Sequence, residues 1–176
     1  MTVESSLLLR RPAEADEEQV LAYRRSFLER GDSLDGTANL RAVATYADWL
    51  SALRDNESQE TVRPGLVDAT TFLAVSRSDG RLVGMIDVRH RLNAYLEQFG
   101  GHIGYSVLPS ERRKGYAAEM LRLALEWCRD YGMERVLVTC DSENIASERT
   151  ILSNGGVLEN RVPEGEGQTC RYWISL

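Results

Sequence analysis

The basic turn at residues 109–117, Pro-Ser-Glu-Arg-Arg-Lys-Gly-Tyr-Ala, is the part of the chain whose residue types and spacing point most directly to chemistry. It follows a short apolar run at 103–108 and opens a long amphipathic pattern, so it predicts a strand, a tight turn and a helix start. A helix start leaves about four backbone N–H groups without partners and carries partial positive charge, and both features favour phosphate. Gly115 lets an anion approach the backbone closely, and Ala117 keeps the first turn small. Further positive charge comes from Arg112, Arg113 and Lys114.

This turn therefore predicts a pyrophosphate-binding cradle. The alternative, a solvated surface turn, is disfavoured because the turn lies between a strand end and a helix opened by glycine. A phosphate loop of the G-x-x-x-x-G-K-[ST] type is disfavoured because that pattern is absent from the sequence.

The turn, read as Arg112-x-x-Gly115-x-Ala117, resembles the R-x-x-G-x-G/A signature of the GCN5-related N-acetyltransferases (GNAT family), which bind acetyl-CoA. The run 103–109, Ile-Gly-Tyr-Ser-Val-Leu-Pro, resembles the fourth strand of that family. Asn144-Ile-Ala-Ser147 resembles the start of the helix after its fifth strand, and Gly155-Gly156 resembles the end of that helix. The resemblance extends from about Phe72 to the C-terminus and implies acetyl-CoA as cosubstrate.

The resemblance also implies which residues hold the cofactor. In the strand, backbone groups would hydrogen-bond the pantetheine arm, as an added strand would. Asn144 is implied to reach the same arm, although its position also suits a helix N-cap, and Ser147 could face the pocket, cap the helix or be exposed. The implied cofactor-binding residues are Tyr105, Val107, Leu108, Arg112, Arg113, Lys114, Gly115, Tyr116, Ala117, Asn144 and Ser147.

Two catalytic roles are less well defined by the sequence. A base with a pKa near neutrality assists the loss of a proton from an amine, and His102 stands near the strand start where some family members carry a glutamate. Because side chains alternate along a strand, a slip of one residue would turn His102 away, so a structural histidine is the alternative. Asp87 is a second candidate for orienting a base or binding the amine. The general acid is unassigned, because Ile151 stands where many relatives carry a tyrosine.

The order of elements predicts an α/β fold with a mixed, mostly antiparallel central sheet and flanking helices, βααβββαβαββ, as in the GNAT family. The turn at 78–80 predicts a hairpin, and the strand–helix–strand segment at 102–140 predicts a parallel pair. A polar loop is expected at 55–68. The expected strands are 7–9, 70–76, 82–89, 102–108, 135–140, 157–162 and 169–176, and the expected helices are 14–30, 37–53, 115–131 and 144–152.

Composition narrows the function class. The chain has 176 residues and we expect one domain over 1–176. Its 21 basic and 27 acidic residues give a net charge of −6, which argues against nucleic acid or an anionic membrane surface as a partner. Three scattered cysteines and the lack of a ligand cluster predict neither disulfides nor a metal site. Without a signal peptide or a long apolar run, a cytoplasmic location is the expectation.

These inferences together predict an acetyl-CoA-dependent N-acetyltransferase in which a primary amine attacks the thioester directly. The acceptor would be a small molecule or a peptide, and its pocket would be built from the first two helices, the loop at 55–68 and the last hairpin. A homodimer is compatible with the sequence. The rival interpretation is a non-catalytic CoA-binding module or sensor on the same fold, and isoleucine at position 151 is its main support.

Overall fold

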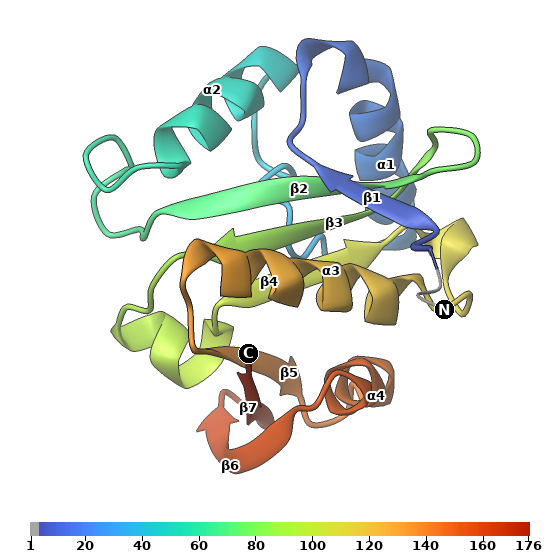
Figure 1. Ribbon diagram of the computed structural model, residues 1–176. Helices are drawn as coiled ribbons and strands as arrows, with labels where there is room; N and C mark the ends of the chain where they lie inside the picture. Colours follow the sequence, from blue (N-terminus) through green and yellow to red (C-terminus); the bar gives the residue numbers. More distant parts are fainter. Residues whose placement is uncertain (1–3) are drawn as a thin grey trace.

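The computed structural model describes residues 4–176 and contains one seven-stranded sheet with the order β1-β2-β3-β4-β5-β7-β6 (Figure 1). Every neighbouring pair of strands is antiparallel except β4 and β5, which are parallel. The predicted mixed, mostly antiparallel sheet is thus confirmed. The strands are β1 (Leu7–Arg10), β2 (Ala69–Ser76), β3 (Leu82–Arg89), β4 (Ile103–Val107), β5 (Arg135–Asp141), β6 (Val157–Glu164) and β7 (Gly167–Ser175).

Helices cover both faces of the sheet around β2 and β3 (Figure 1). Alternate side chains of β2 serve the two faces, as strand geometry requires. Leu73 and Val75 pack with α1 and α2, whereas Phe72 and Ala74 pack with α3, so all of β2 is buried. The helices are α1 (Glu17–Arg30), α2 (Tyr46–Asn56), α3 (Tyr116–Tyr131) and α4 (Ile145–Ser153), with short helical segments η1 (Glu14–Asp16), η2 (Leu96–Gly100) and η3 (Pro109–Glu111). None of the helices in residues 4–176 has the length and apolar character of a membrane span.

The predicted helix at 37–53 is wrong in its first half, because the helix begins only at Tyr46. Ala38 and Asn39 have φ values of 48° and 63°, and this left-handed conformation cannot continue a right-handed helix. The apolar spacing that suggested a helix arises from a loop packed on the core, where Leu40 is fully buried. The true start is marked by Thr45, whose hydroxyl oxygen accepts a hydrogen bond from the Asp48 N–H at 3.1 Å.

The loop that joins α1 to α2 lies directly against β4. A Cβ atom placed on Gly36 would be only 2.3 Å from the carbonyl oxygen of Gly104. Gly36 also has a φ of +69°, which side-chain-bearing residues rarely adopt. Two glycines therefore allow this loop to pack on the middle of the sheet.

The contact between β4 and β5 is short. Strands β3 and β4 are paired at five positions, but β4 and β5 are paired only at Ile103 and Val138. Beyond this pair, towards Val107 and Asp141, the two strands separate. The sheet thus opens in its centre, and peptide groups on that edge of β4 are left without a neighbouring strand.

Candidate functional site

A cavity of about 940 Å³ lies where β4 and β5 separate. Its wall is formed by β4, the end of β5, the first turns of α3 and α4, the loop after α1, and η2. The residues that the sequence predicted for cofactor binding and that the structure brings together on this wall are Tyr105, Val107, Arg112, Arg113, Gly115, Tyr116, Ala117, Asn144 and Ser147.

The start of α3 presents free amides to the cavity. Gly115 is its N-cap residue with a φ of 84°, and the preceding Arg113 has a φ of 65°. The first main-chain hydrogen bond at this helix start runs from the Glu119 N–H to the Gly115 carbonyl, at 3.2 Å. In residues 4–176 the amides of 115–118 have no backbone acceptor. Such a helix start suits a phosphate group, so this part of the wall fits the pyrophosphate of coenzyme A.

Arg112 joins this helix start to the loop after α1. Its guanidinium lies 2.9 Å from Asp32 Oδ2, donates to the Val107 carbonyl at 3.3 Å, and stands over the ring of Phe27. The same guanidinium lowers the pKa of Asp32 from its usual range. By contrast, the side chain of Arg113 is exposed and forms no ion pair with any residue in 4–176. Arg113 is therefore the cation of the turn that is available to an anionic ligand.

Two predicted cofactor residues do not lie on the wall. Lys114 is ion-paired with Glu111 at 2.8 Å. The Leu108 N–H donates to the Val83 carbonyl of β3 at 2.8 Å, so its amide is already used. Because peptide groups alternate along a strand, the N–H and C=O groups of Tyr105 and Val107 face away from β3, towards the gap. The peptide groups of Tyr105 and Val107 are thus placed to take the predicted backbone role, whereas the amide of Leu108 is not.

Asn144 and Ser147 connect the start of α4 to β4. The side-chain oxygen of Asn144 accepts the Ser147 N–H at 3.1 Å, so Asn144 caps the helix while it lines the cavity. The hydroxyl of Ser147 lies 2.7 Å from the hydroxyl of Tyr105. Burial raises the pKa of Tyr105 to about 12. From the sequence only the backbone of Tyr105 had a predicted role, because nothing local indicates a contact between residues 42 positions apart.

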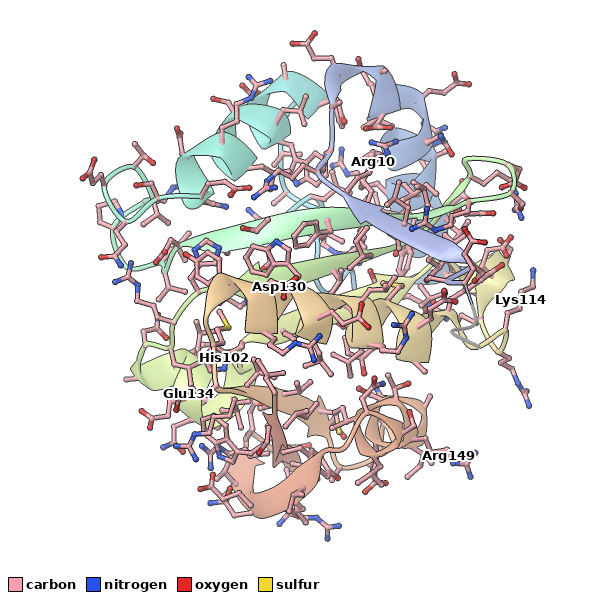
Figure 2. The ribbon with its side chains drawn as sticks, in the orientation of Figure 1. Arg10, His102, Lys114, Asp130, Glu134 and Arg149 are labelled. Atoms are coloured by element: carbon pink, nitrogen blue, oxygen red, sulfur yellow. The ribbon has the colours of Figure 1, made fainter. Side chains whose placement is uncertain are left out.

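His102 is not on the cavity wall. Its Nδ1 accepts a hydrogen bond from the Leu137 N–H at 2.9 Å, and its ring packs edge-on against Trp173. Figure 2 shows His102 and Lys114 at opposite ends of the molecule, so the histidine is far from the basic turn. Burial, together with the charge of Arg89, lowers the pKa of His102 to about 4. The geometry thus favours a structural role over that of a catalytic base.

This role predicts a specific pH dependence of stability. As the pH falls from about 6.5 to about 4, the unfolded chain gains a proton on His102 but the folded chain does not, so the free energy of unfolding should decrease. Below the folded pKa both forms are protonated and the contribution stays constant. In His102→Asn the amide oxygen can still accept the Leu137 N–H but cannot titrate. Urea unfolding measures the free energy of unfolding of the wild type and of His102→Asn between about pH 7 and about pH 4.5. The wild type should lose more stability than the variant as the pH falls, and a difference between the two proteins that stays constant with pH would refute this role.

Asp87, the other candidate near the amine, is also withdrawn from the wall. It is buried, accepts a hydrogen bond from the Thr71 hydroxyl at 2.7 Å, and pairs with Arg89 at 3.1 Å. Arg89 itself lines the cavity. Further wall residues that sequence reasoning missed are Asp32, Asp35, Tyr95, Phe99, Asp141 and Glu164. They come from loops and strand ends and form no sequence motif.

The described residues contain no group of three or more histidine, cysteine, aspartate or glutamate side chains placed to hold a metal ion. The groups that the cavity wall does offer to a ligand are the free amides of a helix start, an open strand edge, a pair of hydroxyl groups and several carboxylates.

Comparisons with known proteins agree with this arrangement. A family model described as an acetyltransferase (GNAT) domain matches residues 6–157. No curated protein sequence matches the chain. Among solved structures, a GNAT-family acetyltransferase from Bacillus anthracis is 23% identical with a TM-score of 0.64, covering 99% of this chain and 98% of that chain.

Two further structures share the fold at lower identity. The ribosomal-protein-S5-alanine acetyltransferase from Vibrio fischeri is 13% identical with a TM-score of 0.70, covering 98% of this chain and 94% of that chain. The microcin C7 self-immunity acetyltransferase MccE, in complex with acetyl-CoA and AMP, is 17% identical with a TM-score of 0.70. The match covers 99% of this chain and 94% of the MccE chain. These likenesses show the fold, and the family model covers most of the chain. The chain belongs to the GNAT acetyltransferase family.

Proposed function

We propose that this protein transfers the acetyl group of acetyl-CoA to a primary amine by direct attack of the amine on the thioester. The observation that carries the proposal is the single cavity that joins the free amides of α3 to the open edge of β4. MccE, which has the same fold, binds acetyl-CoA, and this supports the choice of cosubstrate.

Each part of the wall suits one part of the cofactor. The amides of 115–118 and the side chain of Arg113 would hold the pyrophosphate, with Arg112 beside them. The N–H and C=O groups of Tyr105 and the carbonyl of Val107, which also accepts from Arg112 at 3.3 Å, would pair with the amides of the pantetheine arm, as a neighbouring strand would. The thioester would then lie between β4 and β5, near the start of α4. The N–H of Val107 is our candidate for polarising the thioester carbonyl.

Direct attack is supported by the state of the nearest thiol. Cys140 lines the cavity, but burial raises its pKa to about 11, so it is protonated at neutral pH. A protonated thiol is a poor nucleophile, which disfavours a covalent acetyl-cysteine step. Neither His90 nor His102 lies on the wall, so the amine proton would leave to solvent or by way of the carboxylates there.

The acceptor is proposed to be a small-molecule or peptide amine that carries positive charge before reaction. The wall has five carboxylates, and three of them, Asp35, Asp141 and Glu164, have no ion-pair partner within residues 4–176. They attract an ammonium group electrostatically. Tyr95 and Phe99, whose ring centroids are 5.6 Å apart, add an apolar surface on the η2 side.

The proposal is tested by following thiol release from acetyl-CoA with a panel of polyamines, amino acids and peptides with different N-terminal residues. We expect at least one amine to accelerate thiol release above the rate without amine, with an acetylated product of the expected mass. Calorimetry with CoA on the same preparation separates the alternatives. Tight CoA binding without transfer to any amine would favour the non-catalytic CoA-binding module, and absence of CoA binding would overturn the cofactor assignment itself.

A further inference from the structure

The departing thiolate of coenzyme A needs a proton, and the position that many relatives use for this purpose cannot supply it here. Ile151 is fully buried in the hydrophobic core beneath α4. The cavity wall does contain a hydroxyl pair on the neighbouring turn of the same helix, formed by Ser147 of α4 and Tyr105 of β4. We propose that Tyr105, held by its hydrogen bond to Ser147, is the general acid that protonates this thiolate; the inference rests on the proposed function.

The hydrogen-bond count of this pair leaves a proton for the ligand. Tyr105 and Ser147 have two hydroxyl hydrogens, and the 2.7 Å contact between them uses one. Thr150 and Cys140 also lie beside the pair: burial raises the pKa of Tyr105 and that of Cys140, and hydrogen bonding from Thr150 and from Ser147, respectively, lowers it in part. When Ser147 donates to Tyr105, the phenol O–H is free to point into the gap between β4 and β5. The elevated pKa of the phenol keeps it protonated over the working range of pH.

Other hydroxyl groups near this end of the cavity are already committed. Thr150 donates to the Ala146 carbonyl at 3.0 Å, within its own helix. The Tyr172 hydroxyl donates to Glu148 at 2.8 Å, and Tyr172 is not on the wall. Tyr23 is bound to Ser106 at 2.9 Å and does not line the cavity either. Tyr105 is therefore the half-buried phenol on the wall that contacts α4, through Ser147.

The proposed step balances as follows. The amine nitrogen forms a bond to the thioester carbon, and the carbon–sulfur bond breaks with its electron pair passing to sulfur. The phenol of Tyr105 gives its proton to that sulfur and regains one through the Ser147 hydroxyl, which exchanges with solvent. The acceptor nitrogen loses two protons to solvent, one from the ammonium before attack and one after the carbon–nitrogen bond has formed. Because Tyr105 takes one proton back, the products are the N-acetyl amine, free CoA thiol and one proton.

The first test compares kcat for Tyr105→Phe, Ser147→Ala and the wild type with an amine that the panel identifies. We expect Tyr105→Phe to lower kcat by roughly 10²-fold or more, with an unchanged Kd for CoA, and Ser147→Ala to have a smaller effect. Tyr46→Phe is the matched control, because it also removes a tyrosine hydroxyl hydrogen bond, to the Ala13 carbonyl at 2.7 Å, away from the cavity. A wild-type kcat in Tyr105→Phe, or a larger loss in Ser147→Ala, would overturn the assignment to Tyr105.

The second test needs no acceptor amine. A phenol that donates to the sulfur stabilises the thiolate, so the thiol of bound CoA should have a lower pKa in the wild type than in Tyr105→Phe. A titration of thiolate absorbance should show a difference of about one unit, as expected for one charge-assisted hydrogen bond. Equal pKa values would overturn the inference even if transfer is observed. A difference without transfer to any amine would retain the contact and count against the proposed function instead.

Discussion

Replacing Gly115 with aspartate should lower the affinity for coenzyme A by about 10- to 100-fold. Gly115 is the N-cap of α3, and its amide is one of those without a backbone acceptor. A carboxylate here would face the pyrophosphate with like charge and would compete for the same N–H groups. Loss of charge-assisted hydrogen bonds costs about 1.5–3 kcal/mol, which corresponds to the expected range. Calorimetry with CoA measures the change directly.

The other end of the same helix provides the control. Gly132 follows α3 with a φ of 102°, and Gly115 has a φ of 84°; at both positions an added Cβ would meet nothing within 4 Å. Gly132→Asp therefore introduces the same charge and a similar backbone strain away from the cavity, and we expect its CoA affinity to equal that of the wild type. Arg112→Glu should also weaken binding. Unchanged CoA affinity in both Gly115→Asp and Arg112→Glu would refute the assignment of the cradle.

Replacing Trp49 with alanine should lower the free energy of unfolding by about 3–5 kcal/mol, the usual result of removing a fully buried large aromatic side chain. Trp49 is 0% exposed and packs against Tyr46 in the core between α1, α2 and the sheet. Its indole N–H also donates to the Thr37 carbonyl at 2.9 Å. Thr37 follows Gly36, so this side chain supports the loop that forms one wall of the cavity. Urea denaturation of both proteins measures the difference.

A milder variant separates the two contributions of Trp49. Trp49→Phe keeps much of the aromatic volume but removes one of the two donors to the Thr37 carbonyl, which still accepts the Leu40 N–H at 3.2 Å. From the lost hydrogen bond and the reduced volume together we expect a loss of about 1–3 kcal/mol in the free energy of unfolding. A loss below about 1 kcal/mol in Trp49→Ala would show that the loop and α2 do not depend on this packing.

The parts of the site that were predictable from the sequence depend on neighbouring residues. The turn at 112–117 has its charges, its glycine and its helix start within six positions, and the structure places most of it on the cavity wall. The start of α2 was missed although a local signal existed, because Thr45 and Asp48 form an N-terminal cap that the apolar residues before them obscured. Packing of Leu40 on the core produced a helix-like pattern in a loop.

The catalytic side chains depend on contacts between distant segments. The register of β4 against β5 decides whether His102 faces the cavity. In this register the Leu137 N–H donates a hydrogen bond to His102 Nδ1, and the ring is held away from the cavity. The contact of Tyr105 with Ser147 requires β4 and α4 to lie on the same side of the gap. The carboxylates of Asp35 and Glu164 reach the wall from separate loops and strand ends. Such contacts between distant segments cannot be predicted from the periodicity or the spacing of residues along the chain.

The single residue pair that joins β4 to β5 makes the lifetime of the protein sensitive to its ligand. Without a bound molecule, the open edge of β4 lacks the inter-strand hydrogen bonds that hold the rest of the sheet together. Local unfolding should therefore begin at this edge. A ligand that binds only the folded chain adds about 2.7 kcal/mol of stability at one hundred times its Kd. With acetyl-CoA as the proposed ligand, proteolysis through such openings would slow as acetyl-CoA becomes abundant. The steady-state amount of this protein would then follow the acetyl-CoA supply of the compartment that contains it.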